Sequence, residues 1–268
     1  MQRSSEGYSS APVRPDAGLR AGEDSALETL VACDSPHGRI EILRDPSTGA
    51  TTYVQSGEYQ SACDRDGISL TGYIHGLFSL LRQSKARSVL MIGCGGGTLA
   101  TMLAREGCAV TIADIDPLSF ALARAYFGLL PSVRCHAIDG HAYVAAGGDA
   151  FDAIVLDAYC GDRIPVHLLT ADFFRAVRAR LRADGVFLVN IYVRDASEGD
   201  TRRIARTLGD VWDEVRLLDR REESNRNAIA VAGSVAGLGA STLRMAPAQD
   251  AQRIAAELAA MRYQPLGL

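Results

Sequence analysis

From Ser88 onward, short apolar segments alternate with segments of helical periodicity, and this alternation constrains the fold more than any other feature. The apolar segments read SVLMIG, AVTIAD, SVRCHAID, FDAIVLDA and GVFLVNIY, and WDEVRLLD and NAIAVAGS follow as a final antiparallel pair. Strands without polar alternation, separated by helices, are typical of a parallel sheet that is buried on both faces. We therefore expect a Rossmann-like, doubly wound α/β domain over residues 68–235, with a mostly parallel sheet of seven strands.

The segments on either side of this domain have different patterns. Residues 1–26 are rich in Ser, Pro, Gly and charged residues, and we expect a disordered or loosely attached arm. In residues 27–67, alternating stretches at 39–43 and 51–54 flank the turn signal RDPSTGA, which predicts a small antiparallel β-hairpin domain. Residues 236–268 contain the Ala-rich PAQDAQRIAAELAAM and are expected to form a C-terminal helical extension.

Composition narrows the setting in which the chain works. Hydrophobic residues make up 47% of the 268 residues, yet no run reaches the ~18 to 20 apolar residues of a membrane span. The N-terminus lacks the apolar core of a signal peptide. The cysteines at positions 33, 63, 94, 108, 135 and 160 lack metal-ligand spacing. We expect a cytoplasmic protein without metal or membrane contact, and the net charge of -4 argues against nucleic acid as a partner.

A cluster of glycines lies between the first strand of the alternation and the helix that follows it. In VLMIGCGGGTLATML, Gly93, Gly95 and Gly97 are placed where the strand ends and the helix begins. Glycine lets a ligand approach the backbone closely, and the helix N-terminus then faces that ligand. A ligand-binding loop is one interpretation, and a purely structural turn is the alternative.

Acidic residues end the next three strands. Asp114 ends the second strand about 20 residues after the glycine loop, where a carboxylate can accept hydrogen bonds from ribose hydroxyls. Asp139 ends the third strand, within reach of an adenine amine, and Asp157 ends the fourth. The carboxyl ends of parallel strands meet at the edge where such sheets bind ligands. We predict a nucleoside site there, to which the adjacent Ile115 and Gly140 also contribute. For Asp114 and Asp139, helix capping or a solvated strand end is the alternative role.

These motifs resemble those of class I methyltransferase-fold proteins, which bind S-adenosylmethionine or its relatives. The resemblance narrows to the spermidine synthase (polyamine aminopropyltransferase) family over roughly residues 38–233. GCGGGT resembles the glycine-rich loop of that family, ADID its second strand end, IDG its GDG motif, and FDAIVLDAYCGDRIP its fourth strand with an acidic loop. SGEYQS with Gln60, and Tyr73 on the helix before the glycine loop, resemble its substrate-side residues.

One loop departs from the family pattern. DAYCGDRIP replaces a compact DSSDP-like loop, so that position 160 is cysteine and the next acid, Asp162, is displaced by two residues. The glycines and the acids at positions 114 and 139 match the family motifs, whereas the polyamine contacts do not transfer.

The resemblance implies aminopropyl transfer from decarboxylated S-adenosylmethionine to a putrescine-like amine, as in polyamine biosynthesis, with methylthioadenosine as the product. Asp157 would contact the donor and act as the base, because an amine with a pKa near ~10 arrives protonated. Gln60, Tyr73, Tyr159 and Asp162 are the candidate substrate contacts; Asp162 paired with Arg163, and Tyr73 in core packing, are the alternatives. The scattered His75, His141 and His167 are interpreted as helix caps or solvated residues. The family also implies a homodimer through the N-terminal β region.

Two other functions fit the same motifs. The first is a methyltransferase that uses intact S-adenosylmethionine on an unknown small molecule and releases S-adenosylhomocysteine. The second is a non-catalytic nucleoside-binding protein that has kept the fold. The fold alone does not choose among these functions. A narrow, acidic cavity near Asp157 would favour a polyamine, and a broad apolar mouth would favour methylation of a larger substrate.

Overall fold

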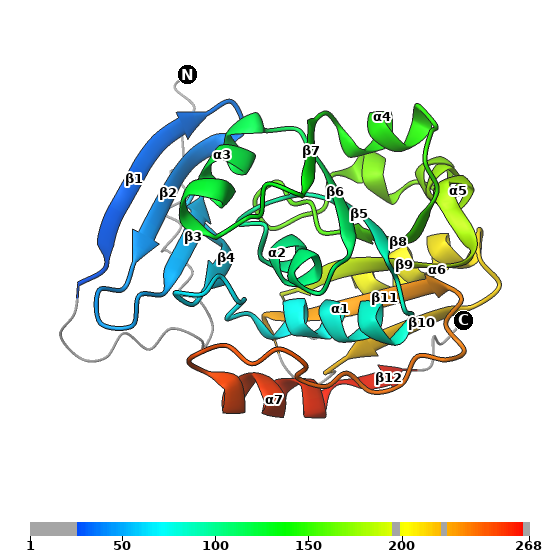
Figure 1. Ribbon diagram of the computed structural model, residues 1–268. Coiled ribbons are helices and arrows are strands. Elements are labelled where there is room, and N and C mark those ends of the chain that lie inside the picture. Colours follow the sequence, from blue (N-terminus) through cyan, green and yellow to red (C-terminus); the bar gives the residue numbers. More distant parts are fainter. Residues whose placement is uncertain (1–25, 195–198, 221–223, 265–268) are drawn as a thin grey trace, which may run out of the picture.

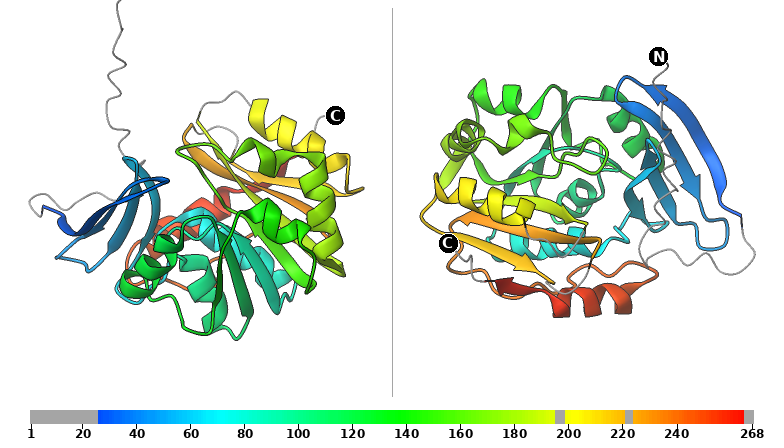
Figure 2. Two further views of the ribbon diagram at one scale, coloured as in Figure 1. Left: turned by 90° about the horizontal axis from the view of Figure 1, so that it is seen from above. Right: turned by 180° about the vertical axis from the view of Figure 1, so that it is seen from behind.

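The computed structural model describes residues 26–194, 199–220 and 224–264 and contains two β-sheets (Figure 1). A four-stranded sheet precedes an eight-stranded central sheet that is covered by helices. The two sheets stand side by side when the molecule is seen from above (Figure 2). Residues 1–25, which make up nearly all of the expected arm, lie outside the described residues.

The N-terminal sheet is antiparallel, and its strands follow one another in sequence order. Its strands are β1 (Glu28–Ser35), β2 (Gly38–Arg44), β3 (Thr51–Gln55) and β4 (Glu58–Cys63). The turn between β2 and β3 is closed by Asp45, whose carboxylate accepts hydrogen bonds from the backbone N–H and the hydroxyl of Ser47. One face of the sheet buries Ile40, Ile42 and Tyr53 against Phe127, which fixes the sheet to the central domain.

The central sheet has the strand order β12-β10-β11-β9-β8-β5-β6-β7. Its strands are β5 (Ser88–Ile92), β6 (Ala109–Asp114), β7 (Arg134–Ala137), β8 (Phe151–Leu156), β9 (Leu181–Val193), β10 (Val215–Asp219), β11 (Arg226–Gly233) and β12 (Arg262–Gln264). The strands from β5 to β9 pair in parallel, and β9, β11, β10 and β12 pair antiparallel in turn. The expected doubly wound, mostly parallel α/β fold is confirmed, but the sheet has eight strands instead of seven because β12 pairs with β10.

Helices cover both faces of the central sheet (Figure 2). They are α1 (Gly72–Gln83), α2 (Thr98–Arg105), α3 (Pro117–Tyr126), α4 (Gly140–Ala145), the short 3-10 helix η1 (Val166–Leu169), α5 (Ala171–Arg180), α6 (Gly199–Gly209) and α7 (Ala251–Ala260). One core cluster packs α1, α2 and α7 on one face, and a second packs α5 and α6 on the other. Burial of apolar side chains on both faces stabilises the fold by about 25 cal/mol for each Å² of apolar surface that is removed from water.

Three helices begin at residues with side-chain caps, and two of these caps border the carboxyl edge of the sheet. Asp116 accepts a hydrogen bond from Leu118 N at the start of α3, and Asp139 accepts one from Ala142 N at the start of α4. Thr170 caps α5 in the same way. Each cap contributes about 1 kcal/mol and fixes where its helix begins, and hence where the preceding loop must turn.

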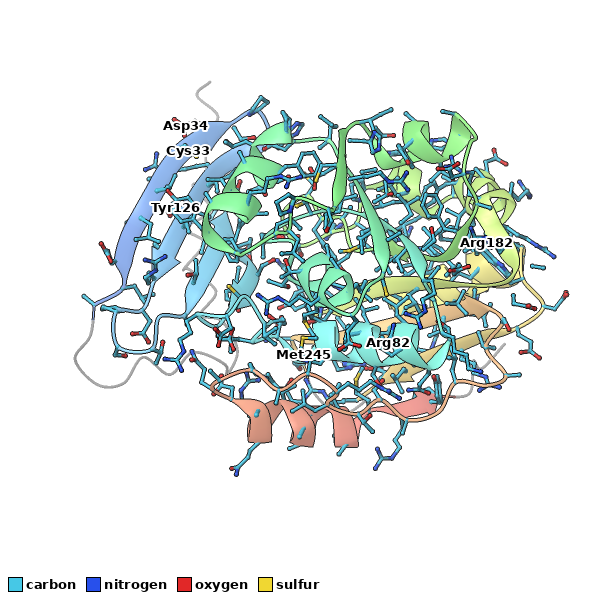
Figure 3. All side chains as sticks on the ribbon, in the orientation of Figure 1. Cys33, Asp34, Arg82, Tyr126, Arg182 and Met245 are labelled. Atoms are coloured by element: carbon cyan, nitrogen blue, oxygen red, sulfur yellow. The ribbon has the colours of Figure 1, made fainter. Side chains whose placement is uncertain are left out.

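Side chains fill the space between the sheet and its helices (Figure 3). The six cysteines are free thiols; Cys33, for example, lies on β1 at the outer side of the N-terminal sheet (Figure 3). Among the described residues, no helix combines the length and apolar character needed to cross a bilayer.

Candidate functional site

A cavity of about 670 Å³ opens at the carboxyl edge of the central sheet and extends to the N-terminal sheet. It is lined by eleven of the twelve residues that sequence analysis proposed for the site: Gln60, Tyr73, Gly93, Gly95, Asp114, Ile115, Asp139, Gly140, Asp157, Tyr159 and Asp162. The exception is Gly97, which occupies the N-cap position of α2 with a φ of +65°. The structure therefore brings together residues that lie up to about a hundred positions apart in the chain.

Gly93 is required by the close packing of the glycine loop on the strand beside it. Its φ is +101°, and a Cβ at this position would lie 2.2 Å from the carbonyl oxygen of Asp157. The loop after β5 therefore lies directly against the residue after β8. Part of the glycine cluster thus serves the packing of the site itself, and the structural interpretation of the loop holds beside the ligand-binding one.

Replacing Gly93 by alanine is expected to lower the free energy of unfolding by about 2–5 kcal/mol. Left-handed backbone costs a non-glycine residue about 1–2 kcal/mol, and the forced displacement of backbone atoms costs about 1–3 kcal/mol more. Gly107→Ala is the matched control, because its φ is +78° but no atom lies within 4 Å of the added Cβ. Denaturant unfolding should show a loss of only about 1–2 kcal/mol for Gly107→Ala, and equal losses would contradict the packing argument.

Asp114 holds the glycine loop and the start of the α3 segment with one carboxylate. Oδ2 accepts from the backbone N–H of Cys94 over 2.7 Å, and Oδ1 accepts from the N–H of Asp116 over 2.8 Å. Burial raises the pKa of this carboxyl above its ordinary value, although both backbone hydrogen bonds lower it. Each carboxylate oxygen has a second lone pair, so that Asp114 can still accept two ligand hydroxyls at the cavity surface.

The N-terminal sheet closes over the glycine loop and contacts it directly. The backbone N–H of Gly96 donates to Oγ of Ser61 on β4 over 3.0 Å. The Ser35 hydroxyl, at the end of β1, donates to the carboxylate of Asp116. The β1–β4 sheet is therefore a wall of the cavity, and residues of both sheets would contact any ligand that occupies it.

Asp139 combines a structural role with a place at the cavity. Its Oδ1 caps α4, as the alternative interpretation proposed, and its Oδ2 pairs with Nε2 of His167 over 2.7 Å. Burial alone would raise the pKa of Asp139, but the N–H of Ala142 and the His167 ring outweigh it and lower the pKa. His167 also lines the cavity, so this end presents an imidazole beside the carboxylate.

Asp157 lines the cavity immediately after β8. Nδ2 of Asn190 donates to its Oδ1 over 2.7 Å, and the Tyr73 hydroxyl donates to its Oδ2 over 3.3 Å. Burial raises the pKa of Asp157, and the hydrogen bonds from Asn190 and Tyr73 lower it only in part. Both donors are neutral, because burial and the neighbouring Asp157 charge raise the pKa of Tyr73 well above 10. The carboxylate can therefore bind a cation or accept a proton.

The other predicted substrate contacts differ in what they leave available to a ligand. The Tyr159 hydroxyl donates to Asn190 O over 2.8 Å and accepts from Tyr192 N over 2.9 Å, so its ring rather than its hydroxyl faces the cavity. Asp162 forms an ion pair with Arg194 at 2.7 Å, and this corrects the expected pairing with Arg163. Gln60 lines the cavity from β4.

One of the three histidines, His75, differs from its interpretation as a cap or solvated residue, whereas His167 is exposed as expected. His75 is fully buried within α1, where Nε2 lies 2.7 Å from Ser69 O and burial lowers its pKa. His167 is paired with a carboxylate at the cavity, as described above. The spacing of the apolar residues around His75 predicts a helix. It does not predict that His75 is buried, because a buried helix face with this spacing can also hold one polar residue.

Sequence reasoning missed Asn190 and Asn227, which line the cavity from β9 and β11. Asn190 interrupts the apolar run GVFLVNIYV, and a single amide in a strand that is otherwise apolar was the available signal. Its significance depends on strand register, which places Asn190 beside Asp157 and is not encoded in either segment alone.

The comparisons with known proteins first define the class. Residues 89–185 match the family model described as a methyltransferase domain, and this range contains the glycine loop and the three acids. The chain is 31% identical over 157 residues to the N-terminal histidine N-methyltransferase of Emericella nidulans, covering 57% of this chain and 27% of that protein. Fold and site residues together define a protein with the methyltransferase fold.

Further comparisons show similarity to one particular form of the methyltransferase fold. The chain is 34% identical over 146 residues to the polyamine aminopropyltransferase of Vibrio vulnificus, covering 52% of this chain and 48% of the relative. A probable spermidine synthase from Corynebacterium glutamicum has the same fold, with a TM-score of 0.71, 17% identity, and 90% and 91% of the two chains covered. The chain has a spermidine synthase-like methyltransferase fold, and it spans about half or less of the first curated relatives it matches.

Proposed function

We propose that this chain transfers an aminopropyl group from decarboxylated S-adenosylmethionine to an amine acceptor of the putrescine type. The relatives named polyamine aminopropyltransferase support the transfer, and the residues that line the cavity support the amine acceptor. A homodimer through the N-terminal sheet and a cytoplasmic location stay predictions.

The observation that carries the proposal is the arrangement around Asp157. A half-buried carboxylate lines the cavity beside the glycine loop, and its hydrogen-bond donors, Asn190 and Tyr73, carry no charge. A positive charge brought by a ligand would therefore find an uncompensated carboxylate in a site of low dielectric constant. The same position would repel a carboxylate on a ligand, and this difference favours a decarboxylated donor and a cationic acceptor.

The wider cavity is acidic as well. Three arginines line it, and two of them are paired with carboxylates: Arg226 with Asp219, and Arg253 with Asp250 and Glu257. Seven carboxylates line it, two of which (Asp162 and Glu257) are paired with arginines. The seven are Glu58, Asp114, Asp116, Asp139, Asp157, Asp162 and Glu257. A dicationic amine would be attracted into such a cavity.

The residues fit a nucleoside donor at the other end. Asp114 offers free lone pairs for two ribose hydroxyls, and Gly93 and Gly95 line the cavity with backbone alone. Asp139 and His167 present a hydrogen-bonding pair to the base, beside the exposed Ile115. When bound, the donor supplies a carbon that is activated by a sulfonium sulfur.

Aminopropyl transfer forms a C–N bond and breaks a C–S bond, and the electron pair of the broken bond stays on sulfur in methylthioadenosine. Because a neutral thioether leaves, no acid is needed, and the protein must align the reactants and deprotonate the amine. Asp157 first pairs with the acceptor ammonium and then takes its proton, which frees the nitrogen lone pair for attack. The raised pKa of Asp157 brings it closer to that of the amine and so makes this proton transfer less unfavourable.

Methyl transfer is the second candidate, and the match of residues 89–185 to a methyltransferase domain favours it. In that case the glycine-loop backbone would have to accept the carboxylate of intact S-adenosylmethionine. The N–H groups of Cys94 and Gly96 are already donated to Asp114 and Ser61, which leaves that carboxylate fewer partners.

The deciding experiment is to incubate the purified protein with decarboxylated or intact S-adenosylmethionine and a panel of linear diamines. Mass spectrometry is expected to show an aminopropyl adduct of the amine together with methylthioadenosine, with the decarboxylated donor only. A methylated acceptor and S-adenosylhomocysteine would instead establish the second candidate.

If calorimetry shows nucleoside binding while neither product forms, the chain is a non-catalytic nucleoside-binding protein. Asp157→Asn, incubated under the same conditions, controls for transfer that does not depend on the cavity.

A further inference from the structure

A line of side-chain hydrogen bonds runs from β11 through β9 to Asp157. Nδ2 of Asn227 donates to Oδ1 of Asn190 over 2.9 Å, and Nδ2 of Asn190 donates to Oδ1 of Asp157 over 2.7 Å. Asn190 is only 2% exposed, whereas Asn227 is partly exposed at the cavity wall. An amide on β11, seventy positions further along the chain, is thus connected to the Asp157 carboxylate.

Strand register explains why these three side chains meet. The parallel register of β8 and β9 places Asn190 beside Asp157, at the carboxyl edge of the sheet. On the other side, Asn190 pairs with Ile229 of antiparallel β11, and Asn227 precedes Ile229 by two residues. Side chains two residues apart on a strand share a face, so Asn227 is the diagonal neighbour of Asn190 on the cavity side.

The donor and acceptor properties of these groups fix the direction in which the hydrogen bonds run. An ionised carboxylate only accepts hydrogen bonds, so Asn190 must turn its NH2 group to Asp157 and its carbonyl to Asn227. If the Asn190 amide rotated by half a turn, its carbonyl would face the carboxylate and its NH2 would face the NH2 of Asn227. The donation from Asn227 therefore reinforces the orientation in which Asn190 stabilises an ionised Asp157.

The backbone of Asn190 is held independently of these amides. The Tyr159 hydroxyl donates to Asn190 O over 2.8 Å and accepts from Tyr192 N over 2.9 Å, which clamps β9 to the loop after Asp157. Loss of the Asn227 amide would therefore weaken the hold on the Asn190 side chain while its backbone stays in place.

Among the described residues, the ionisable groups that face Asp157 are Tyr73 from α1 and Tyr159 from the loop after β8. Burial raises the pKa of both phenols well above 10, so both stay neutral where the carboxylate titrates. The ionisation of Asp157 thus depends on burial, on the Tyr73 hydroxyl and on the donation from Asn190.

We propose that Asn227, acting through Asn190, is a positioning residue that keeps the Asp157 carboxylate ionised and oriented toward the acceptor amine. The inference rests on the proposed function for its catalytic consequence, whereas the relay itself is a property of the protein without substrate.

The relay can be tested by NMR on protein labelled at the aspartate 13Cγ position. The resonance that is absent from Asp157→Asn assigns Asp157, and its titration gives the pKa without any turnover. Asn190→Leu is expected to raise that pKa by about one to two units, because a donor to the charged form is lost. Asn227→Leu should raise it by about half a unit, since the carbonyl of Asn190 then lacks the donor that holds and polarises this amide.

The double variant separates a relay from two independent effects. In the Asn190→Leu background, Asn227→Leu should cause no further shift, because the intermediary is gone. A second, additive shift, or no shift in Asn227→Leu alone, would overturn the proposal. Asn225→Gly is the matched control: it removes an amide from the same segment at a φ of +53°, contacts Tyr192 instead of Asn190, and should leave the pKa unchanged.

Kinetic measurements test the catalytic consequence of the proposal. The acid limb of the kcat/KM profile of Asn227→Leu, which reports the free enzyme, should move to higher pH by the same amount as the NMR midpoint, with kcat/KM recovering at alkaline pH. If the wild-type protein forms no aminopropyl product, the proposed function fails while the NMR result still decides the relay. Serine variants at both positions, checked by circular dichroism, replace any leucine variant that does not fold.

Discussion

Asp157→Asn is expected to lower kcat for aminopropyl transfer by about 10²–10⁴-fold while leaving nucleoside affinity nearly unchanged. The amide has the shape of the carboxylate, can accept from Asn190, and can donate to the Tyr73 oxygen, so the hydrogen bonds of the site persist. What is lost is the negative charge and the ability to take a proton. Product formation by mass spectrometry and methylthioadenosine binding by calorimetry measure the two quantities separately, and near-normal turnover would remove Asp157 from its role as base.

The same substitution should increase stability. The folded-state pKa of Asp157 is raised by burial, so its contribution to stability is fully present below the unfolded pKa and is lost as pH rises through the folded value. The amide of Asp157→Asn is neutral at every pH, so the variant keeps this contribution to stability. Its Tm should exceed that of the wild type by a few degrees at alkaline pH. The difference should vanish as the wild-type carboxyl becomes protonated in acid.

Asp152, at the opposite end of β8, is the matched control with the opposite sign. Burial raises its pKa, but the Arg182 side chain and the N–H groups of Arg87 and Ser88 outweigh this, and its pKa is lowered. Its stabilising effect is therefore present above the unfolded pKa and is lost as pH falls through the folded value. Asp152→Asn should lower Tm at neutral pH and leave kcat unchanged.

Asp114→Ala is expected to weaken methylthioadenosine binding by about 10²–10⁴-fold. Two hydrogen bonds from ribose hydroxyls to a charged acceptor are worth about 1.5–3 kcal/mol each, and each 1.4 kcal/mol corresponds to a factor of ten in affinity. The substitution also frees the N–H groups of Cys94 and Asp116, which loosens the glycine loop. Calorimetry at neutral pH measures the change, and unchanged affinity would mean that the ribose binds elsewhere.

An analogue without the two ribose hydroxyls is the control for this prediction. Wild type and Asp114→Ala should bind it with similar, weak affinity, because the contact in question is absent from both complexes. Binding of methylthioadenosine to the wild type should also weaken in acid, as the carboxylate of Asp114, whose pKa is raised by burial, becomes protonated.

Much of the central fold could be predicted from the sequence, since buried parallel strands read as apolar runs and helices keep their own period. The glycine loop and the acids at positions 114, 139 and 157 followed from the rule that strand ends share one edge. The strand β12 could not be found in this way, because Arg262–Gln264 has no apolar pattern and forms only by pairing with β10.

The hydrogen bonds inside the site were beyond sequence reasoning for a related reason. Partners such as Asn190 and Asn227 are defined by register between strands, and a shift by one residue would reverse which face each side chain occupies. The pairing of His167 with Asp139 likewise depends on how the loop after β8 returns to the start of α4. Local patterns predict the elements, whereas these contacts arise from their assembly.

The residues that line the cavity come from two parts of the chain, and this affects how substrate specificity can change. The segment that matches the methyltransferase domain, residues 89–185, supplies the glycine loop, the three acids that end strands, and the loop that holds Tyr159 and Asp162. Other lining residues come from the N-terminal sheet, the start of α1, the end of β9, β11 and α7, all of which lie outside that segment. We expect a chimera that exchanges only the flanking segments to alter the surroundings of Asp157 while the glycine loop and the three acids stay in place.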